Sequence, residues 1–180
     1  MELLRDYNAT AHLYDKRYRD EQIPKINFLL DKLRPKEGDI LLDVGCGTGL
    51  LFERVSCRLI LGVDISINML REAKKRAREG AGSKQNPFGK IKDVELILAD
   101  AEFLPIRSGS MDIVVSITAL QLAGDQDRAI YEMLRVLKDQ GSFGISIIKK
   151  ASIPKGLPNG TEVYDMEEIK DVFCVGRKER

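Results

Sequence analysis

Short apolar runs that alternate with helical segments constrain the fold of this chain more than any other feature of its sequence. Five such runs occupy residues 39–44, 59–63, 94–98, 111–117 and 142–148. Each is short and mostly aliphatic, which is typical of a strand buried on both faces. Segments with helical spacing lie between them, at residues 51–55, 66–78 and 127–138. The alternation predicts an α/β fold: a Rossmann-like, doubly wound, mostly parallel sheet of six or seven strands with helices on both faces.

Two helices are expected before the first strand. Residues 3–19 carry Tyr7, Ala11, Tyr14 and Tyr18 at helical spacing. A second helix is expected to begin near Pro24, since proline suits a first helical turn, and to stop at residues 35–38. Residues 1–37 are therefore predicted to form N-terminal helices that precede a core at residues 38–150.

The C-terminal segment, residues 151–180, completes one domain that spans residues 1–180. We expect a short helix at 167–173 and one further strand that starts at Cys174. This leaves little room for a terminal hairpin, so the sheet is predicted to be truncated at its C-terminal end. An exposed edge or apolar patch there would be open to a partner. Residues 80–92, with three glycines and one proline, are expected to form a loop.

Composition excludes several chemistries. Twenty-nine Lys and Arg residues balance 28 Asp and Glu residues, which argues against strong non-specific binding to nucleic acid. One histidine, His12, excludes a His-rich metal site, and three cysteines without a C-x-x-C pair indicate a reducing compartment. No apolar run approaches the roughly 18–20 residues of a membrane-spanning helix, and the acidic N-terminus does not resemble a signal peptide. A cytoplasmic protein without metal is expected.

A glycine-rich turn and a distant acidic residue indicate a nucleoside site. The turn, Gly45-Cys46-Gly47-Thr48-Gly49, follows the first strand. Asp64 lies nineteen residues after Gly45, at the carboxyl end of the second strand. A carboxylate at that point is placed to accept both hydroxyls of a ribose. Glycine-rich turns also occur for packing reasons, but the combination favours a cofactor that contains a nucleoside.

The acidic residues near the turn distinguish between cofactors. The turn has the spacing G-x-G-x-G rather than the dinucleotide pattern G-x-G-x-x-G, and Asp43 lies two residues before its first glycine. A carboxylate there disfavours a pyrophosphate and favours a ligand with an ammonium group. Residues 100–102, Asp-Ala-Glu, follow the third strand and offer polar groups to an adenine. We therefore expect a sulfonium nucleoside with an amino-acid tail.

Four spaced motifs between residues 38 and 148 resemble those of class I S-adenosylmethionine-dependent methyltransferases. They are Leu41-Leu42-Asp43-Val44-Gly45-Cys46-Gly47-Thr48-Gly49, Gly62-Val63-Asp64-Ile65-Ser66, Ala99-Asp100-Ala101-Glu102 and Met111-Asp112-Ile113-Val114-Val115-Ser116. The opening Tyr7-Asn8 and Tyr14-Asp15 resemble the lid helix of the ubiquinone-biosynthesis and tRNA wobble-uridine branches. The resemblance implies S-adenosyl-L-methionine as cofactor and methyl transfer as the activity.

The resemblance also implies a cofactor-binding role for individual residues. Asp43 and the backbone of Gly45, Cys46 and Gly47 would hold the methionine part, and Asp64 the ribose. The adenine would contact Ile65, Met69, Asp100, Ala101 and the loop that holds Glu102. Ser116 and Gln121 would border the methyl group and the acceptor, and Tyr14, with Tyr7, would close over the carboxylate. Simpler interpretations remain open: Met69 as core, the tyrosines as packing, and Cys46 as a small filler.

Three hypotheses for function follow. The first is a methyltransferase that acts on a small molecule or on RNA, tRNA included. The second is an RNA or protein methyltransferase that needs a small zinc-binding activator subunit, or a homodimer, at an exposed sheet edge. The third is a non-catalytic nucleotide-fold binding protein. No Asn-Pro-Pro-Tyr or Asp-Pro-Pro-Tyr follows the fourth strand, which disfavours methylation of base amines or glutamine amides, and no catalytic residue is assigned.

Overall fold

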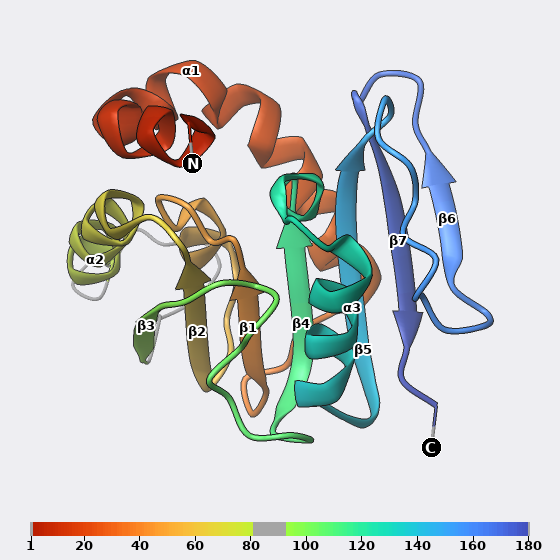
Figure 1. The fold of residues 1–180 in the computed structure, drawn as a ribbon. Helices are drawn as coiled ribbons and strands as arrows, with labels where there is room; N and C mark the ends of the chain where they lie inside the picture. Colours follow the sequence, from red (N-terminus) through yellow and green to blue (C-terminus); the bar gives the residue numbers. More distant parts are fainter. Residues whose placement is uncertain (1, 81–92, 180) are drawn as a thin grey trace.

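A seven-stranded sheet with helices on both faces forms the body of the protein (Figure 1). The computed structural model describes residues 2–80 and 93–179, and within them the side chains of all residues but 2–10, 12 and 80. The strand order is β3-β2-β1-β4-β5-β7-β6. The strands are β1 (Ile40–Val44), β2 (Leu59–Asp64), β3 (Val94–Leu98), β4 (Met111–Ile117), β5 (Leu137–Ile148), β6 (Glu162–Asp165) and β7 (Asp171–Arg177). The helices are α1 (Glu2–Leu33), η1 (Leu50–Arg54), α2 (Ile67–Gly80), η2 (Leu120–Leu122) and α3 (Gln126–Val136).

The first five strands pair in parallel, and β7 runs antiparallel to both β5 and β6. The order reverses direction between β1 and β4, which is where ligands bind in sheets of this kind. The predicted α/β, doubly wound, mostly parallel sheet is confirmed. Within the described residues, no helix combines the length and the apolar character that a membrane span requires.

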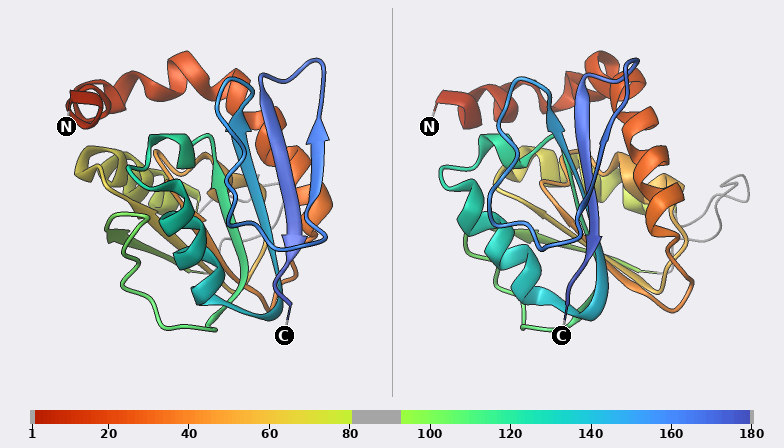
Figure 2. Two further views of the ribbon diagram at one scale, coloured as in Figure 1. Left: turned by 45° about the vertical axis from the view of Figure 1, so that its right-hand side comes forward. Right: turned by 90° about the vertical axis from the view of Figure 1, so that its right-hand side faces the viewer.

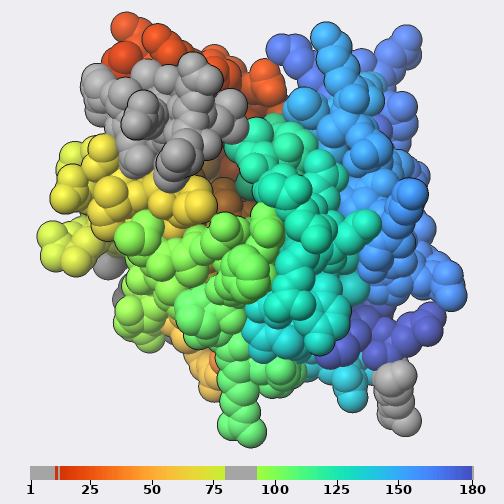
Figure 3. Space-filling model, viewed as in Figure 1, coloured from red at the N-terminus to blue at the C-terminus, as the bar shows by residue number. Residues whose placement is uncertain are grey.

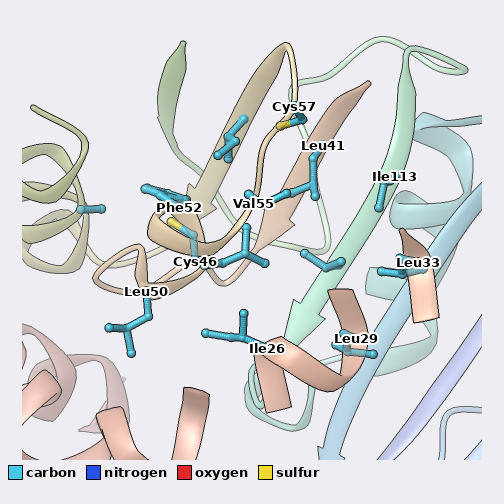
Figure 4. Packing of buried hydrophobic residues seen from close by; sticks show 14 of the residues in the cluster. Ile26, Leu29, Leu33, Leu41, Cys46, Leu50, Phe52, Val55, Cys57 and Ile113 are labelled. Atoms are coloured by element: carbon cyan, nitrogen blue, oxygen red, sulfur yellow. The ribbon is translucent and has the colours of Figure 1, made fainter. Parts of the chain in front are cut away.

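Each face of the sheet carries its own hydrophobic core. Along β1, Leu41 faces the cluster under α1, η1 and α2, whereas Leu42 faces the cluster under α3. Figure 2 shows the sheet almost edge-on in its right-hand view, with α3 on one side and the second half of α1 on the other. In Figure 4, Ile26, Leu29 and Leu33 of α1 lie over Leu41 and Ile113 of the sheet. Burial on both faces explains why these strands are continuous apolar runs.

The sheet is complete at its C-terminal end, so the expected truncation is wrong. Residues predicted as a helix at 167–173 instead form a turn and the start of β7, which pairs with β5 from Ile148↔Asp171 to Ser142↔Arg177. A short apolar run such as Val172–Val175 fits a buried strand as well as a helix, and here pairing with β5 decides the outcome. Among the strands that the structure describes, β3 and β6 lie at the edges of the sheet.

The N-terminal region is one helix rather than two. Pro24 lies inside α1, and Figure 2 shows that the helix changes direction between its two halves. Proline removes one backbone hydrogen bond and bends a helix. The helix continues past Pro24 because its second half is buried: Ile26 and Leu29 are at most 2% exposed. The loop expected at 80–92 lies outside the described residues, apart from Gly80 at the end of α2.

Candidate functional site

A cavity of about 490 Å³ opens at the carboxyl ends of β1, β2, β3 and β4. The loops after these strands line it, and Tyr14 of α1 contributes from above. Figure 1 shows the first half of α1 lying across this end of the sheet. The volume falls within the roughly 300–1,000 Å³ of small-molecule sites.

The glycine turn after β1 forms one wall of the cavity. Gly45 and Gly47 have φ angles of 75° and 52°, a left-handed conformation that side chains disfavour. The N–H groups of Gly45 and Cys46 both donate to the Val63 carbonyl, at 2.8 and 3.0 Å. A Cβ on Gly45 would collide with the Cβ of Ala119. The glycines therefore allow the turn to pack directly against the segment after β4.

Asp64 connects the glycine turn to the start of α2. Its Oδ2 accepts a hydrogen bond from the Gly47 N–H at 2.9 Å, and its Oδ1 accepts one from the Ser66 N–H at 2.8 Å. Burial raises the pKa of this carboxyl, against the effect of these backbone donors. The carboxylate is thus fixed by backbone groups while it lines the cavity.

Asp43 is the more deeply buried carboxylate, with 3% of its surface exposed. Burial, and then the nearby Asp64 carboxylate, raise its pKa to about 7. No side chain among those described donates a hydrogen bond to it. It borders a smaller pocket of about 40 Å³ that shares Tyr14, Gly45 and Gly47 with the main cavity. Two carboxylates with raised pKa values favour a positively charged ligand at this point.

Cys46 borders the smaller pocket and is 8% exposed. Burial, together with Asp43 and Asp64, raises the pKa of its thiol well above the ordinary value. The group is therefore a neutral thiol at physiological pH, in agreement with its interpretation as a small filler rather than a nucleophile.

The residues predicted to contact adenine come together in the lining of the cavity. Ile65, Met69, Asp100, Ala101 and Glu102 all line the cavity. Ile65 is 52% exposed at its rim, whereas Met69 is buried. Glu102 Oε1 accepts a hydrogen bond from the Asp125 N–H at 2.9 Å, which joins the loop after β3 to the start of α3. Figure 3 shows these two segments, green and teal, side by side on this face.

Two predicted residues lie elsewhere. Ser116 is fully buried, and its hydroxyl donates to the Val44 carbonyl at 2.8 Å, so it joins two strands and does not line the cavity. Gln121 lies on η2 outside the lining, and its amide donates to the Thr118 carbonyl at 2.7 Å. The lining instead includes Thr118, Ala119 and Leu120, which the sequence analysis did not assign. Their position at the carboxyl end of β4 is the feature of the sequence that could have identified them as lining residues.

Tyr14 lines both pockets, and its neighbour Asp15 fixes α1 to the glycine turn. Asp15 accepts a 2.6 Å hydrogen bond from the Thr48 hydroxyl and forms an ion pair with Arg76 of α2. The side chains of Tyr7 and His12 lie outside those described.

The fold and the site define a methyltransferase domain. A family model described as a methyltransferase domain matches residues 42–145, which is more than half of the chain. The chain belongs to this family.

The chain is similar to a malonyl-[acyl-carrier protein] O-methyltransferase of a Marinomonas species. The two are 29% identical over 173 residues, which cover 91% of this chain and 60% of the relative. The chain spans about half the length of the curated relatives it matches.

Two solved structures share the fold. One is a Methanococcus maripaludis protein described as a candidate S-adenosyl-L-methionine-dependent methyltransferase, with a TM-score of 0.73, 13% identity, and 98% and 94% of the two chains covered. The other comes from the complex between the Haloferax volcanii Trm112 methyltransferase activator and its candidate methyltransferase. It has a TM-score of 0.65 and 24% identity, and covers 78% of this chain and 59% of that one.

Proposed function

We propose that this chain is an S-adenosylmethionine-dependent methyltransferase. The observation that carries the proposal is the pair Asp43 and Asp64, a buried and a half-buried carboxylate beside a glycine turn, both with raised pKa values. The pair disfavours a pyrophosphate, because bringing further negative charge against two carboxylates is unfavourable. It fits a ligand that carries an ammonium and a sulfonium. Membership of the methyltransferase family supports the same cofactor.

The lining residues fit the parts of this cofactor. Asp43 would face the ammonium, with the backbone of residues 45–47 against the methionine part, and Asp64 would accept the ribose hydroxyls. The apolar side chains of Ile65 and Met69 would pack against the adenine, with Asp100 and Ala101 at its polar edge. Glu102 would act indirectly, because its carboxylate holds the N-terminus of α3.

The bound cofactor supplies a methyl group on a sulfonium, which is a very good leaving group. The protein then has to align an acceptor with the methyl group and to exclude water. Orientation of this kind lowers the activation barrier by up to about 7–11 kcal/mol. Tyr14 and the first half of α1 would form the roof that excludes water. We assign no general base.

Calorimetry tests the cofactor. Wild-type protein should bind S-adenosylmethionine and not NAD. Asp64→Ala should weaken binding by about 1–3 kcal/mol, because charged hydrogen bonds are lost. Asp139→Ala removes an exposed carboxylate from the strand β5 and should leave affinity unchanged. Tight binding of NAD with no binding of S-adenosylmethionine would overturn the cofactor assignment and favour a non-catalytic nucleotide-fold protein. Equal S-adenosylmethionine affinity in the Asp64 variant would mean that Asp64 does not bind the ribose.

The acceptor class, a small molecule or RNA such as tRNA, belongs to the proposal as well. A labelled-methyl transfer assay against cell extract, separated into RNA, protein and small molecules, identifies it. Label in protein alone would contradict both classes, although it would leave methyl transfer intact.

A small activator subunit is a second element of the proposal. The Haloferax volcanii relative forms a complex with Trm112, and here the edge strand β3 presents Leu98 with 55% of its surface exposed. An unpaired strand edge is suited to a partner. Solubility only on co-expression with such an activator supports it, and a stable, monodisperse monomer that transfers methyl groups alone contradicts it.

A further inference from the structure

A polar cluster with a fully buried ion pair at its centre lies where α1, β5 and β7 meet the end of β4. Lys25 and Asp171 have side chains with 0% exposure, and the Lys25 Nζ lies 2.9 Å from Asp171 Oδ1. The ammonium also reaches Glu21 Oε1 at 2.9 Å and Thr118 Oγ1 at 3.1 Å. An ammonium has three hydrogens, and three oxygens lie around it. Lys25 thus donates hydrogen bonds to Glu21 and Thr118 and forms an ion pair with Asp171.

The other half of the cluster consists of two hydroxyl groups. Thr118 Oγ1 donates to Asp171 Oδ2 at 2.8 Å, and Ser146 Oγ donates to the same oxygen at 2.9 Å. The Thr118 N–H in turn donates to Ser146 Oγ at 3.0 Å. Both the backbone and the side chain of Thr118 are therefore bound to buried groups that come from other strands.

The backbone of Thr118 is in a conformation that its side chain disfavours. Its φ angle is 54°, in the left-handed region, which a β-branched residue rarely adopts. Such a conformation persists only where surrounding contacts impose it, and it is concentrated at functional sites. The buried cluster supplies those contacts.

This backbone turn shapes the cavity. After Thr118 the chain leaves β4 and enters η2, and Ile117, Thr118, Ala119 and Leu120 all line the cavity. Ala119 packs against Gly45 of the glycine turn. A change in the backbone at Thr118 therefore moves the part of the lining that packs against the glycine turn.

We infer that Thr118 is a positioning residue for the cofactor cavity, held in its left-handed conformation by the buried Lys25–Asp171–Ser146 cluster. The inference rests on the proposed cofactor site. Because Lys25 belongs to α1, the same cluster fixes the roof helix and the wall after β4 relative to each other. Thr118 acts through the backbone it fixes rather than through contact of its hydroxyl with the ligand.

Two substitutions separate the hydroxyl of Thr118 from its shape. Thr118→Val keeps the β-branched side chain and removes the hydroxyl, whereas Thr118→Ser keeps the hydroxyl. Ser146→Ala removes the hydroxyl that donates to Asp171 and that accepts from the Thr118 N–H, without touching the cavity. The Thr118 N–H keeps its second acceptor, the Ser146 carbonyl at 3.0 Å. Thr161→Val is the matched control, because the Thr161 hydroxyl donates to the Pro158 carbonyl at 2.6 Å in a turn away from the cavity.

The first measurement is calorimetric titration with S-adenosylmethionine at a temperature where circular dichroism shows every variant folded. We expect Thr118→Val and Ser146→Ala to raise Kd about tenfold, and Thr118→Ser and Thr161→Val to stay within about twofold. A purely structural role would lower the melting temperature and leave Kd of the folded protein unchanged. Equal Kd values for Thr118→Val and wild type would overturn the inference.

The second measurement needs no cofactor. Hydrogen exchange of the free protein should be faster over residues 117–123 in Thr118→Val than in wild type, and unchanged there in Thr118→Ser. If wild type does not bind S-adenosylmethionine, the proposed function fails, and hydrogen exchange alone tests the inference about Thr118. Unchanged exchange over 117–123 in Thr118→Val would then overturn the inference.

Discussion

The hydroxyl of Thr48, in the glycine turn, donates a 2.6 Å hydrogen bond to the carboxylate of Asp15 on α1. Arg76 of α2 joins the same contact: its Nε donates to the Thr48 carbonyl at 2.8 Å, and its guanidinium pairs with Asp15 and with Glu53. The side chain of Arg76 is only 12% exposed. The helix α1 is thus attached to the glycine turn, which forms one wall of the cavity.

Loss of this attachment should weaken cofactor binding. Arg76→Ala removes hydrogen bonds to three partners, and we expect S-adenosylmethionine affinity to fall by about 1–2 kcal/mol, with faster dissociation. Lys75→Ala, one position earlier on α2, removes an exposed pair with Glu72 and should leave the affinity as it is. Stopped-flow dissociation and calorimetry check both. Equal dissociation rates for the two variants would show that α1 is held by other contacts.

Cofactor affinity should depend on pH through Asp43. Its carboxyl has a pKa of about 7 in the free protein, raised by burial and by Asp64. A cationic ligand binds the ionised form, so affinity should rise as pH increases through 7 and approach a plateau above it. Below pH 7 the fall should be at most about tenfold per pH unit. In Asp43→Asn the affinity should be lower at pH 8 and nearly flat from pH 6 to 8. A profile in this variant as steep as that of wild type would assign the dependence to another group, with Asp64 the first to test.

The free protein should lose stability as the pH rises from about 4 to 7. A carboxyl whose pKa is raised on folding binds more protons in the folded state than in the unfolded state between its two pKa values. Asp43 therefore lowers the free energy of unfolding by roughly 2–4 kcal/mol between about pH 4 and pH 7. Above pH 7 its carboxyl is ionised in both states and causes no further decrease. Asp64, also raised, acts in the same direction. Urea unfolding at several pH values should find Asp43→Asn more stable than wild type at pH 8. A less stable variant would mean that the ionised carboxylate makes compensating contacts.

Substitution of Gly45 should be destabilising for two separable reasons. Gly45→Ala forces a side chain into a left-handed backbone and against the Cβ of Ala119. We expect a loss of about 2–3 kcal/mol in thermal or chemical unfolding. Ala119→Gly in the same chain should restore part of it, because the collision is removed and the backbone strain is not. Gly38→Ala, with no atom within 4 Å of the added Cβ, should be neutral or slightly stabilising. Full recovery in the double variant would mean that the φ angle of Gly45 carries no cost.

The parts of the fold that the sequence predicts are those with local signals. β4 is found at residues 111–117 as expected, since a buried parallel strand is a continuous apolar run. Asp43, Gly45 and Asp64 come together because each lies at the end of a parallel strand, so sequence position alone gives their location.

The parts it does not predict depend on distant contacts. β7 exists because β5 offers a pairing edge, and α1 continues through Pro24 because its far half is buried in the core. Ser116 was assigned to the cavity from its position near the end of β4, but its side chain points to Val44 within the sheet. Thr118 has no motif of its own. Its role follows from Lys25 and Asp171, which lie 93 and 53 residues away in the sequence.

The packing of α1 after Pro24 limits which part of this helix can move when a ligand enters. Its second half is packed on the sheet, and Lys25, the residue after the proline, is fixed to Asp171 in the interior. If the first half of α1 moves away from the strand ends, it therefore rotates about Pro24 while the second half stays packed on the sheet. Access and release would thus require the contacts of the first half to break, among them the pairs Thr48–Asp15, Arg76–Asp15 and Arg19–Glu53.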